Sequence, residues 1–475
     1  MTLLHSTRDK DKKQITYTDA LLTGLAPDGG LYVPSEYPQL TDSNLSILRC
    51  HSEIFSNIAV RVKARFAGDS ISRDQLEVLA MHAYDPVKFP ESPHKIVPIR
   101  QIDDGLFIQN LSLGPTAAFK DIPLQMVAQE MNYELERRNQ TLTLLGATSG
   151  DTGSAAEAAV QGLERIKIFM LSPQVGMSDF QRAQMGSLTG DNVFNISIDG
   201  RFDPCQDLVK LCNMDAEFKS KYNLGAVNSI NWGRISSQVA YVISGYVQAT
   251  KRNTEVDFVV PTGNFGNVLS VYIAKQMGVP IRRIIIATNE NNIIDRMMKT
   301  GTYDVRPAQI TSSPSMDISK ASNFERLFYD MVEGDSSQVR QFVEKLNKDG
   351  KVDMTHYGIT PQKFQDLGFF SGTSTHQDRI NTINQVYATS RSIIDPHTAD
   401  AVTVGMRLFD NRDVPMICFE TALPVKFEQT INEALGFVPP RVPRFRDLES
   451  SIGRHGFHNM SVDANALKQY IRERA

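Results

Sequence analysis

The sequence has few cysteines for its length, and none of them has a paired spacing. Its 475 residues contain four, at positions 50, 205, 212 and 418, and no Cys-x-x-Cys motif occurs. The absence of that spacing argues against a zinc ribbon and a dithiol redox motif, so we expect no metal site. Scattered thiols are typical of a reducing compartment, which favours a cytoplasmic protein.

Long apolar runs and a surplus of positive charge are also missing. No apolar stretch approaches the roughly 18–20 residues that cross a bilayer, and the N-terminus shows no targeting pattern. The 50 basic and 54 acidic residues give a formal net charge of -4, whereas a protein that binds nucleic acid needs a basic face. We therefore expect a cytoplasmic protein with neither a membrane nor a nucleic-acid partner.

The length and the composition are those of a globular protein with several domains. Hydrophobic residues make up 41% of the chain and charged residues 22%, and the length corresponds to roughly two to four domains. The first domain is expected over residues 1–92, with a short strand at 31–33 and helical spacing over 43–66 and 72–84. Three prolines at positions 86, 90 and 93 then mark a boundary.

Beyond that boundary, strand and helix patterns alternate. This order predicts an α/β protein with parallel sheets and right-handed crossovers. We expect residues 93–440 to form two lobes, the smaller at about 125–225, followed by a charged helical tail over 441–475 in which Ser461 or Asp463 caps a last helix. The region 300–380 is expected to be helical and irregular. Strands are predicted at 106–108, 142–145, 166–171, 193–198, 225–227, 256–260, 284–287 and 416–419.

A lysine in an apolar setting is the first candidate for chemistry. Lys120 follows Ala-Ala-Phe in the stretch Gly-Pro-Thr-Ala-Ala-Phe-Lys-Asp at 114–121. Burial lowers the pKa of a lysine and makes its amine a usable nucleophile and base. The plainer alternative is a lysine whose stem covers apolar surface while its ammonium group stays in water. Taken alone, Lys120 does not decide between the two.

Three loops that follow predicted strands could hold a ligand. The small-residue loop at 146–153 precedes a helix and could bind an anion through backbone N–H groups, although a capped turn explains it equally well. It is neither a Walker A loop nor a Gly-x-Ser-x-Gly motif. The loop Pro-Thr-Gly-Asn-Phe-Gly-Asn at 261–267 could hold a phosphate in the same way. Thr421, after the strand at 416–419, offers a neutral hydroxyl or a helix cap.

The sequences of these motifs and their order along the chain resemble those of the threonine synthases. This is a family of fold-type II pyridoxal phosphate enzymes, here in its longer bacterial and fungal form. The resemblance runs nearly end to end. It implies an α/β fold like that of the tryptophan synthase β subunit, with two parallel-sheet domains and an N-terminal α+β extension. The matching segments are residues 6–8, 25–32, 114–121, 147–153, 228–232, 261–267, 316–319 and 322–326.

The resemblance also implies roles for individual residues. Lys120 matches the lysine that holds pyridoxal 5'-phosphate as a Schiff base and moves protons, and Thr421 matches the residue facing the pyridine nitrogen. The loop that grips the cofactor phosphate is matched by Gly263, Asn264, Phe265, Gly266 and Asn267. The loop near the substrate carboxylate is matched by Ser149, Gly150, Asp151 and Thr152.

A phosphorylated substrate also needs cations and hydrogen-bond donors. The candidates are Arg234, Arg326 and Lys426, with Asn231 and Ser149 as donors. We favour Arg234 because it follows the Asn231-Trp232 segment at a predicted helix start. For each basic residue, a structural or solvated ion pair is the alternative.

The activity that the resemblance implies is the conversion of O-phospho-L-homoserine and water to L-threonine and phosphate. Two alternatives stay open. A phospho-lyase would release 2-oxobutyrate, ammonia and phosphate, and a non-catalytic protein would bind the cofactor only for interaction. The sequence departs from the family at Leu113 and Leu423, where many relatives carry a polar residue or histidine. The oligomeric state, monomer or homodimer, is left open.

Overall fold

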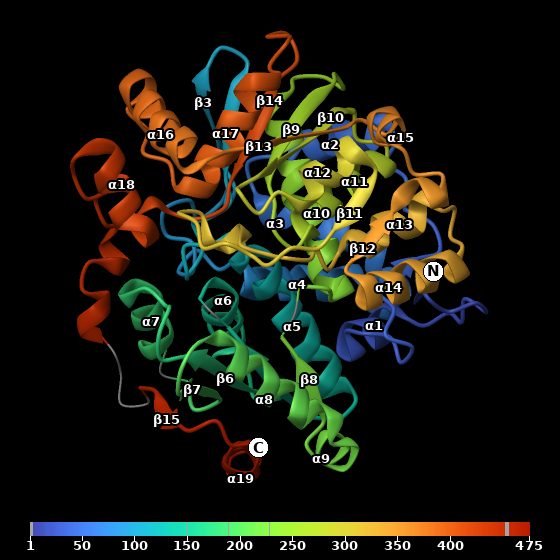
Figure 1. Ribbon diagram of the computed structural model, residues 1–475, viewed down its shortest axis with the longest axis vertical. Coiled ribbons are helices and arrows are strands. Elements are labelled where there is room, and N and C mark those ends of the chain that lie inside the picture. Colours follow the sequence, from blue (N-terminus) through green and yellow to red (C-terminus); the bar gives the residue numbers. More distant parts are fainter. Residues whose placement is uncertain (1–2, 149, 189, 228, 452–455) are drawn as a thin grey trace.

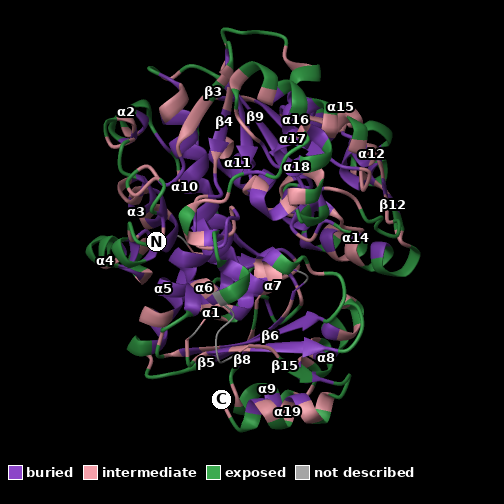
Figure 2. Ribbon diagram, turned by 90° about the vertical axis from the view of Figure 1, so that its left-hand side faces the viewer, coloured by how far each residue is buried: buried purple, intermediate pink, exposed green. Residues whose placement is uncertain are grey.

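The computed structural model describes residues 3–148, 150–188, 190–227, 229–451 and 456–475. Figure 1 shows two lobes, each built on a sheet, with the N-terminal segment beside the larger lobe. Figure 2 shows that the central strands of both sheets are buried, whereas the edge strand β3 (Ile99–Asp103) is partly exposed and most exposed residues lie on the outer helices and loops. Within these residues, no helix has the length and apolar character needed to span a membrane.

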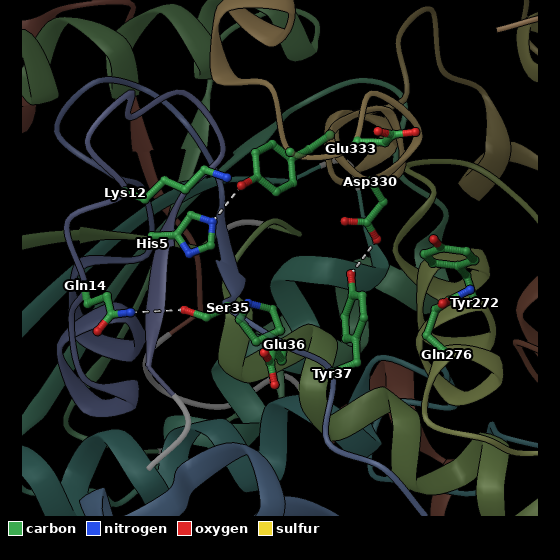
Figure 3. A pocket seen from close by; sticks show the side chains of 13 residues that line it. His5, Lys12, Gln14, Ser35, Glu36, Tyr37, Tyr272, Gln276, Asp330 and Glu333 are labelled. Carbon is green, nitrogen blue, oxygen red and sulfur yellow. Dashed lines mark hydrogen bonds between the residues drawn. The ribbon is translucent and has the colours of Figure 1, made fainter. Parts of the chain in front are cut away.

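The N-terminal segment combines two short strands with four helices. The strands pair antiparallel, and His5 on the first of them reaches the hydroxyl of Tyr329 at 2.7 Å (Figure 3). The helix expected over 43–66 is divided in two, because a turn at residues 51–54 separates a helix capped by Thr41 from one that buries Phe55 and Ile58. The elements are β1 (Leu4–Ser6), α1 (Tyr17–Thr23), β2 (Tyr32–Pro34), α2 (Asp42–Cys50), α3 (Phe55–Ala67), η1 (Gly68–Ser70) and α4 (Arg73–Ala83).

The larger lobe is built on a six-stranded sheet in the order β13-β10-β9-β14-β4-β3, in which only β3 runs antiparallel to its neighbour. Alternate residues of β9 face opposite layers: Phe258 and Val260 pack with α10 and α11, and Val259 packs with α16 and α17. Both faces of the sheet are therefore covered, as expected for parallel strands with continuous apolar sequence. The strands are β3 (Ile99–Asp103), β4 (Leu106–Asn110), β9 (Val256–Pro261), β10 (Ile281–Thr288), β13 (Phe369–Thr373) and β14 (Met416–Glu420).

Three helices of the larger lobe, α10, α11 and α17, carry residues of the cavity described below. A buried helix, α10, lies against the sheet, and α11 begins directly after the loop at 263–265. Two further strands, β11 and β12, pair antiparallel outside the main sheet. The remaining elements are α10 (Trp232–Ala249), α11 (Gly266–Gln276), α12 (Ile293–Thr300), β11 (Thr302–Asp304), η2 (Pro314–Met316), α13 (Phe324–Met331), α14 (Ser336–Asp349), β12 (Lys351–Asp353), η3 (Met354–Tyr357), α15 (Pro361–Asp366), α16 (His376–Ser390) and α17 (Pro396–Leu408).

The smaller lobe is a five-stranded parallel sheet in the order β15-β7-β6-β5-β8. Helices α5 and α6 pack with residues of one face, and α8 and α19 with residues of the other. Its elements are α5 (Asp121–Arg137), β5 (Leu142–Ala147), α6 (Asp151–Val160), β6 (Ile166–Pro173), α7 (Asp179–Gly186), β7 (Val193–Ile198), α8 (Phe202–Met214), α9 (Ala216–Lys221) and β8 (Leu224–Ala226).

The C-terminal tail contributes more than a helix. It contains β15 (His458–Met460), which extends the small sheet beside β7, and α19 (Ala464–Arg472), which Asp463 caps through bonds to Asn465 N and Ala466 N. Asp463 is thus the cap, not Ser461. The domain boundaries themselves stay a prediction. The elements between β14 and β15 are η4 (Pro424–Phe427), α18 (Glu428–Leu435), η5 (Pro443–Phe445) and η6 (Leu448–Ser451).

Candidate active site

Lys120 lies at the junction of the two lobes, where the segment after β4 enters α5. The backbone before it is fastened to the end of β14, because Phe119 N donates to Thr421 O at 2.9 Å. Ala117 adopts a left-handed conformation with φ 57°, which is uncommon for a residue with a Cβ. These contacts fix the lysine at the carboxyl end of the large sheet, where α/β proteins bind their ligands.

The first turn of α5 is held by its own acidic residue. Thr116 donates to the Asp121 carboxylate from its backbone N at 2.9 Å and from its hydroxyl at 2.7 Å. Gly114 is required beside it, since a Cβ there would lie 2.4 Å from the Asp121 Cβ. The motif at 114–121 is therefore a folded loop whose shape fixes the direction of the Lys120 side chain.

The Lys120 amine faces a cavity shared by both lobes. Desolvation by burial lowers its pKa, although the nearby Asp151 carboxylate, 3.2 Å away, acts in the opposite direction. The cavity is narrow, about 70 Å³, below the roughly 300–1,000 Å³ of ligand pockets, so a ligand that fills it requires side chains to move apart. Its lining includes Lys120, Thr152, Ser229, Arg234, Gln238, Gly263, Asn264, Phe265, Gly266, Asn267, Ser315, Met316, His397 and Thr421.

Asp151, the first residue of α6, connects three other segments at this point. Its carboxylate lies 2.5 Å from Lys426 Nζ and accepts hydrogen bonds from Ser315 Oγ at 2.8 Å and from Gln181 Nε2 at 3.1 Å. Burial alone would raise the pKa of Asp151, but Lys120 and Lys426 bring it well below the ordinary value. The site thus contains a buried carboxylate between two lysines.

The loop at 263–267 has the features of an anion-binding cradle. Phe265 has φ 66° and turns the chain into α11, whose first N–H groups have no partner within the helix. A Cβ at Gly263 would lie 3.0 Å from Ser315 O, so glycine keeps the loop open there. Asn267 Oδ1 accepts a hydrogen bond from the Tyr241 hydroxyl at 2.6 Å. The buried Nδ2 of the same side chain has no hydrogen-bond partner among the described residues. The loop fits a phosphate of a cofactor.

Other residues named from the sequence lie around the same cavity. Thr421, Thr152 and Arg234 are among its lining residues, and Gly150 precedes Asp151 at φ 152°, a conformation that suits glycine. Burial lowers the pKa of Arg234 to about 10, which leaves the guanidinium charged at neutral pH. Ser149 lies outside the described residues.

The structure does not bring Asn231 and Arg326 to the cavity lining. Asn231 caps α10, accepting from Gly233 N at 2.8 Å and donating to Leu21 O at 2.8 Å. Arg326 donates to Tyr32 O at 2.9 Å and to Ile230 O at 2.6 Å, and its guanidinium lies over the Trp232 ring. In this structure both residues hold the N-terminal segment against the larger lobe, and a role in binding substrate stays a prediction.

A histidine and a serine of the cavity were not found from the sequence. His397 is buried, with Nδ1 2.7 Å from the Asp395 carboxylate, and its Nε2 accepts a bond from Ser315 N at 3.0 Å. An imidazole thus reaches the cavity from α17. The sequence offered one signal, the pattern Asp-Pro-His-Thr at 395–398, which combines a helix cap with a proline in the first turn.

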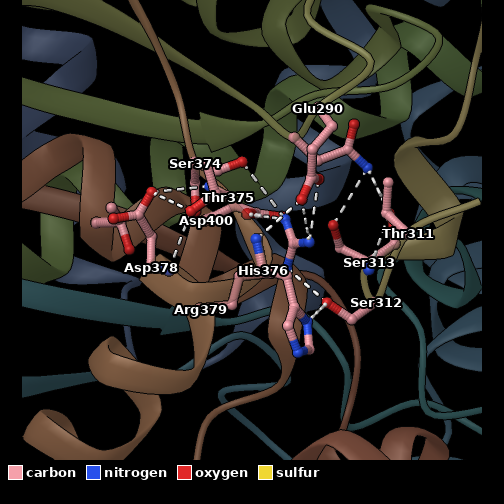
Figure 4. Close-up of polar contacts among 12 residues, drawn as sticks. Glu290, Thr311, Ser312, Ser313, Ser374, Thr375, His376, Asp378, Arg379 and Asp400 are labelled. Carbon is pink, nitrogen blue, oxygen red and sulfur yellow. Dashed lines mark hydrogen bonds and ion pairs between the residues drawn. The ribbon is translucent and has the colours of Figure 1, made fainter. Parts of the chain in front are cut away.

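A polar network fixes the loop that carries Ser315. Arg379 is fully buried and binds Glu290 at 2.9 Å, Asp400 at 3.0 Å and Ser312 Oγ at 2.7 Å (Figure 4). Asn289 donates to Thr311 Oγ1 at 2.9 Å in the same network. The Arg379 guanidinium is paired with the carboxylates of Glu290 and Asp400. The role of this network is therefore to hold the loop in place.

Comparisons with known proteins agree with this site. Three family models match in chain order: "Threonine synthase N terminus" over residues 4–84, "Pyridoxal-phosphate dependent enzyme" over 88–358 and "Threonine synthase, C-terminal" over 398–471. A threonine synthase of Corynebacterium glutamicum is 45% identical over 472 residues, which cover 98% of this chain and 97% of the relative. The chain belongs to the threonine synthase family.

Solved structures of this family share the whole fold. The pyridoxal phosphate-bound threonine synthase from Brucella melitensis superposes with a TM-score of 0.94 at 36% identity and covers 100% of this chain and 99% of its own. The yeast threonine synthase gives 0.92 at 34% identity, with 100% and 98% coverage. The predicted fold class, a fold-type II pyridoxal phosphate enzyme with parallel sheets and an N-terminal extension, is confirmed, and pyridoxal phosphate is the cofactor of the family.

Proposed function

We propose that this protein is a threonine synthase, converting O-phospho-L-homoserine and water to L-threonine and phosphate. The observation that carries the proposal is the placement of the Lys120 amine. It is largely withdrawn from solvent, forms an ion pair with Asp151, and faces the same cavity as the loop at 263–267. A lysine base, an anion cradle and a buried arginine are what a phosphorylated amino-acid substrate needs. We assign the protein to the cytoplasm, consistent with its scattered thiols.

The residues present fit the cofactor at three points. Lys120 would hold it covalently, the backbone N–H groups at residues 263–267 with Asn267 Nδ2 would bind its phosphate, and the Thr421 hydroxyl would face its ring nitrogen. Pyridoxal phosphate, when bound, supplies an electron sink for the negative charge left on carbon after proton removal. Because a threonine hydroxyl carries no charge, it does not favour a protonated ring nitrogen as a carboxylate would.

Lys120 is the group that moves protons. Its lowered pKa increases the fraction of neutral amine at physiological pH, which is the form that accepts a proton. Once it is free of the cofactor, Lys120 Nζ would take one proton from the α carbon of the substrate, return it, and then take one from the β carbon. The phosphate leaves from the γ carbon with the electron pair of its C–O bond, and water adds at the β carbon as Lys120 gives its proton back. Asp151 balances the positive charge that the amine gains each time, since its carboxylate lies within 3.2 Å.

The substrate phosphate requires positive charge and donors in the same cavity. Arg234 is the buried guanidinium of the lining, and Thr152 and Gly150 at the start of α6 offer a hydroxyl and a backbone group for the substrate carboxylate. Lys426 is less available, because Asp151 and Thr116 O already accept from its ammonium. Replacing Arg234 by Met should raise KM for the phosphorylated substrate more than it lowers kcat.

One incubation tests the proposal. The purified holoenzyme is mixed with O-phospho-L-homoserine, and phosphate, threonine and 2-oxobutyrate are measured together. Phosphate and threonine in equal amounts are expected. Equal amounts of phosphate and 2-oxobutyrate would identify a phospho-lyase, and the absence of phosphate release would remove both activities and leave a protein that only binds the cofactor.

A further inference from the structure

A second pocket, the N-terminal pocket, lies at the C-terminal end of α11, whose N-terminal end lines the Lys120 cavity. Its volume is about 500 Å³, within the range of small-molecule sites. Figure 3 shows side chains from the N-terminal segment facing those of α11 and α13 across it. The lining that matters most is His5, Lys12, Tyr37, Tyr272, Tyr329 and Asp330.

Buried and half-buried polar groups form the floor of this pocket. Tyr37 OH donates to the Asp330 carboxylate at 2.8 Å, and burial raises the pKa of Asp330 to about 6, so the group is ionised at neutral pH. His5 Nε2 lies 2.7 Å from Tyr329 OH, while its buried Nδ1 has no hydrogen-bond partner among the described residues. A pocket whose floor holds a carboxylate and three tyrosines is built for a polar ligand.

The charges around the pocket favour a cation. Three carboxylates line it, from Glu36, Asp330 and Glu333, against the single ammonium of Lys12, and burial lowers the pKa of His5, which keeps the imidazole neutral. The pocket also lies beside Gln276 and Glu333, at the C-terminal ends of α11 and α13. The carbonyl ends of helices carry partial negative charge and attract cations.

One cation of the chain itself, the Lys12 ammonium, already lies against an aromatic ring of this pocket. The Lys12 ammonium lies 5.7 Å from the centre of the Tyr329 ring, a cation–π distance, and tyrosine faces are a recurring means of binding alkylammonium groups. Lys12 and Glu333 on the rim both have positive φ, 48° and 55°. Such a conformation costs free energy in residues with a Cβ and is concentrated at functional sites.

The two helices connect this pocket to the cofactor loop. The first residue of α11, Gly266, belongs to the loop at 263–267, whereas Tyr272 and Gln276 near its end line the N-terminal pocket. Asn323, directly before α13, donates from its backbone N and from Nδ2 to Asn264 O, each at 3.1 Å. A shift of either helix at the pocket therefore reaches the loop.

We propose that the N-terminal pocket binds a small alkylammonium cation through Asp330 and the three tyrosines, and that binding alters the grip of the 263–267 loop on the cofactor. The second part follows because affinities at two coupled sites change reciprocally. The site is distinct from the Lys120 cavity, and its existence does not depend on which product the enzyme forms.

Choline is a suitable probe, because its quaternary nitrogen cannot react with pyridoxal phosphate as a primary amine does. Titration calorimetry on the holoenzyme should show saturable binding of choline and none of its neutral isostere 3,3-dimethylbutan-1-ol. Asp330→Asn should weaken binding about tenfold. Lys12→Gln, which removes a competing cation, should strengthen it by up to about fivefold. The exposed Glu344→Gln on α14 is the matched control.

Two results would overturn the proposal. The site is wrong if choline does not bind, or if choline and its neutral isostere bind alike and Asp330→Asn changes neither. The coupling is wrong if saturating choline leaves the cofactor dissociation rate, followed by absorbance, the same in the wild type. Both measurements are independent of product formation, so they separate this proposal from the proposed activity.

Discussion

Lys63 and Lys120 have opposite surroundings. Lys63 on α3 donates to Gly233 O, Ser236 Oγ and Ser237 Oγ at 2.7–2.9 Å and lies 3.2 Å from the Glu130 carboxylate. Lys120, among the described residues, has Asp151 as its single hydrogen-bond and ion-pair partner and faces a cavity. Burial lowers the pKa of both, so a lowered pKa does not by itself mark a reactive lysine.

The difference lies in what the ammonium can do next. An amine surrounded by four acceptors is fixed in place, and removing it leaves those acceptors buried without a donor. An amine with one partner and an adjacent cavity can change its partner and accept a proton. A structural lysine is therefore one whose ammonium group has all its hydrogen bonds satisfied, and a reactive lysine is one whose ammonium group has not.

The largest effect is expected from Lys120→Ala. Because this change removes both the covalent attachment and the base, kcat should fall by at least about 10³-fold. Borohydride reduction followed by mass spectrometry should find a pyridoxyl group on the wild type and none at this position in the variant. The thermal midpoint should change little, since Asp151 keeps its contact with Lys426. Normal turnover in Lys120→Ala would refute the assignment.

Lys63→Met should lower stability strongly and leave the attachment of the cofactor intact, the reverse of Lys120→Ala. Removing the lysine leaves Glu130 buried without its cation, which costs about 3–5 kcal/mol of unfolding free energy, measured by urea denaturation. Covalent attachment of the cofactor should persist. The double change Lys63→Met with Glu130→Leu should recover part of the stability, because it removes the unpaired buried charge, although Gly233 O, Ser236 Oγ and Ser237 Oγ still lack the lysine as donor. An unaltered unfolding midpoint in the single variant would contradict the structural role.

Asp151→Asn tests how the carboxylate tunes Lys120. The negative charge of Asp151 raises the pKa of the lysine against the effect of burial, so its removal should lower that pKa further. The neutral amine reacts with the cofactor, and the pH profile of the attachment rate should therefore move to lower pH. Stopped-flow absorbance on the cofactor-free enzyme measures this, with the exposed Asp179→Asn as control. A profile that does not move, or moves upward, would show that the pair is not coupled.

The smallest effect is expected at His397. His397→Phe keeps the volume but removes the acceptor for Ser315 N, and one hydrogen bond of about 1 kcal/mol corresponds to roughly a fivefold loss in kcat/KM. His397→Gln, which retains an acceptor, should lose less. Equal losses in the two variants would point to packing against Phe427 as the role of the imidazole.

The sequence predicted the strands and loops that carry strong local signals. Lys120, the loop at 263–267 and Thr421 follow long apolar strands, and strand ends of a parallel sheet meet at one edge, so these residues reach one cavity. Helix α7 was missed, as were β3, β13 and β15. The strand β3 is partly exposed, β13 follows a glycine in a stretch that resembles a loop, and β15 has three residues.

The residues that the structure places outside the cavity and those that the sequence did not reveal have a common physical cause. Asn231 and Arg326 lie within segments that match the family, but nearby backbone groups bind their side chains, which a linear pattern does not reveal. Ser315 and His397 reach the cavity through contacts between segments 82 residues apart. Local patterns carry no information on such pairings.

The position of β14 in the large sheet has a consequence for how the protein is made. This strand, Met416–Glu420, lies between β9 and β4, and residues of β9 and β4 are paired with it on either side. On the ribosome, β4 and β9 therefore have no shared neighbour until more than 85% of the chain has emerged. Until then the nascent chain exposes unpaired apolar strands, and chaperones that shield such edges should be needed late in synthesis.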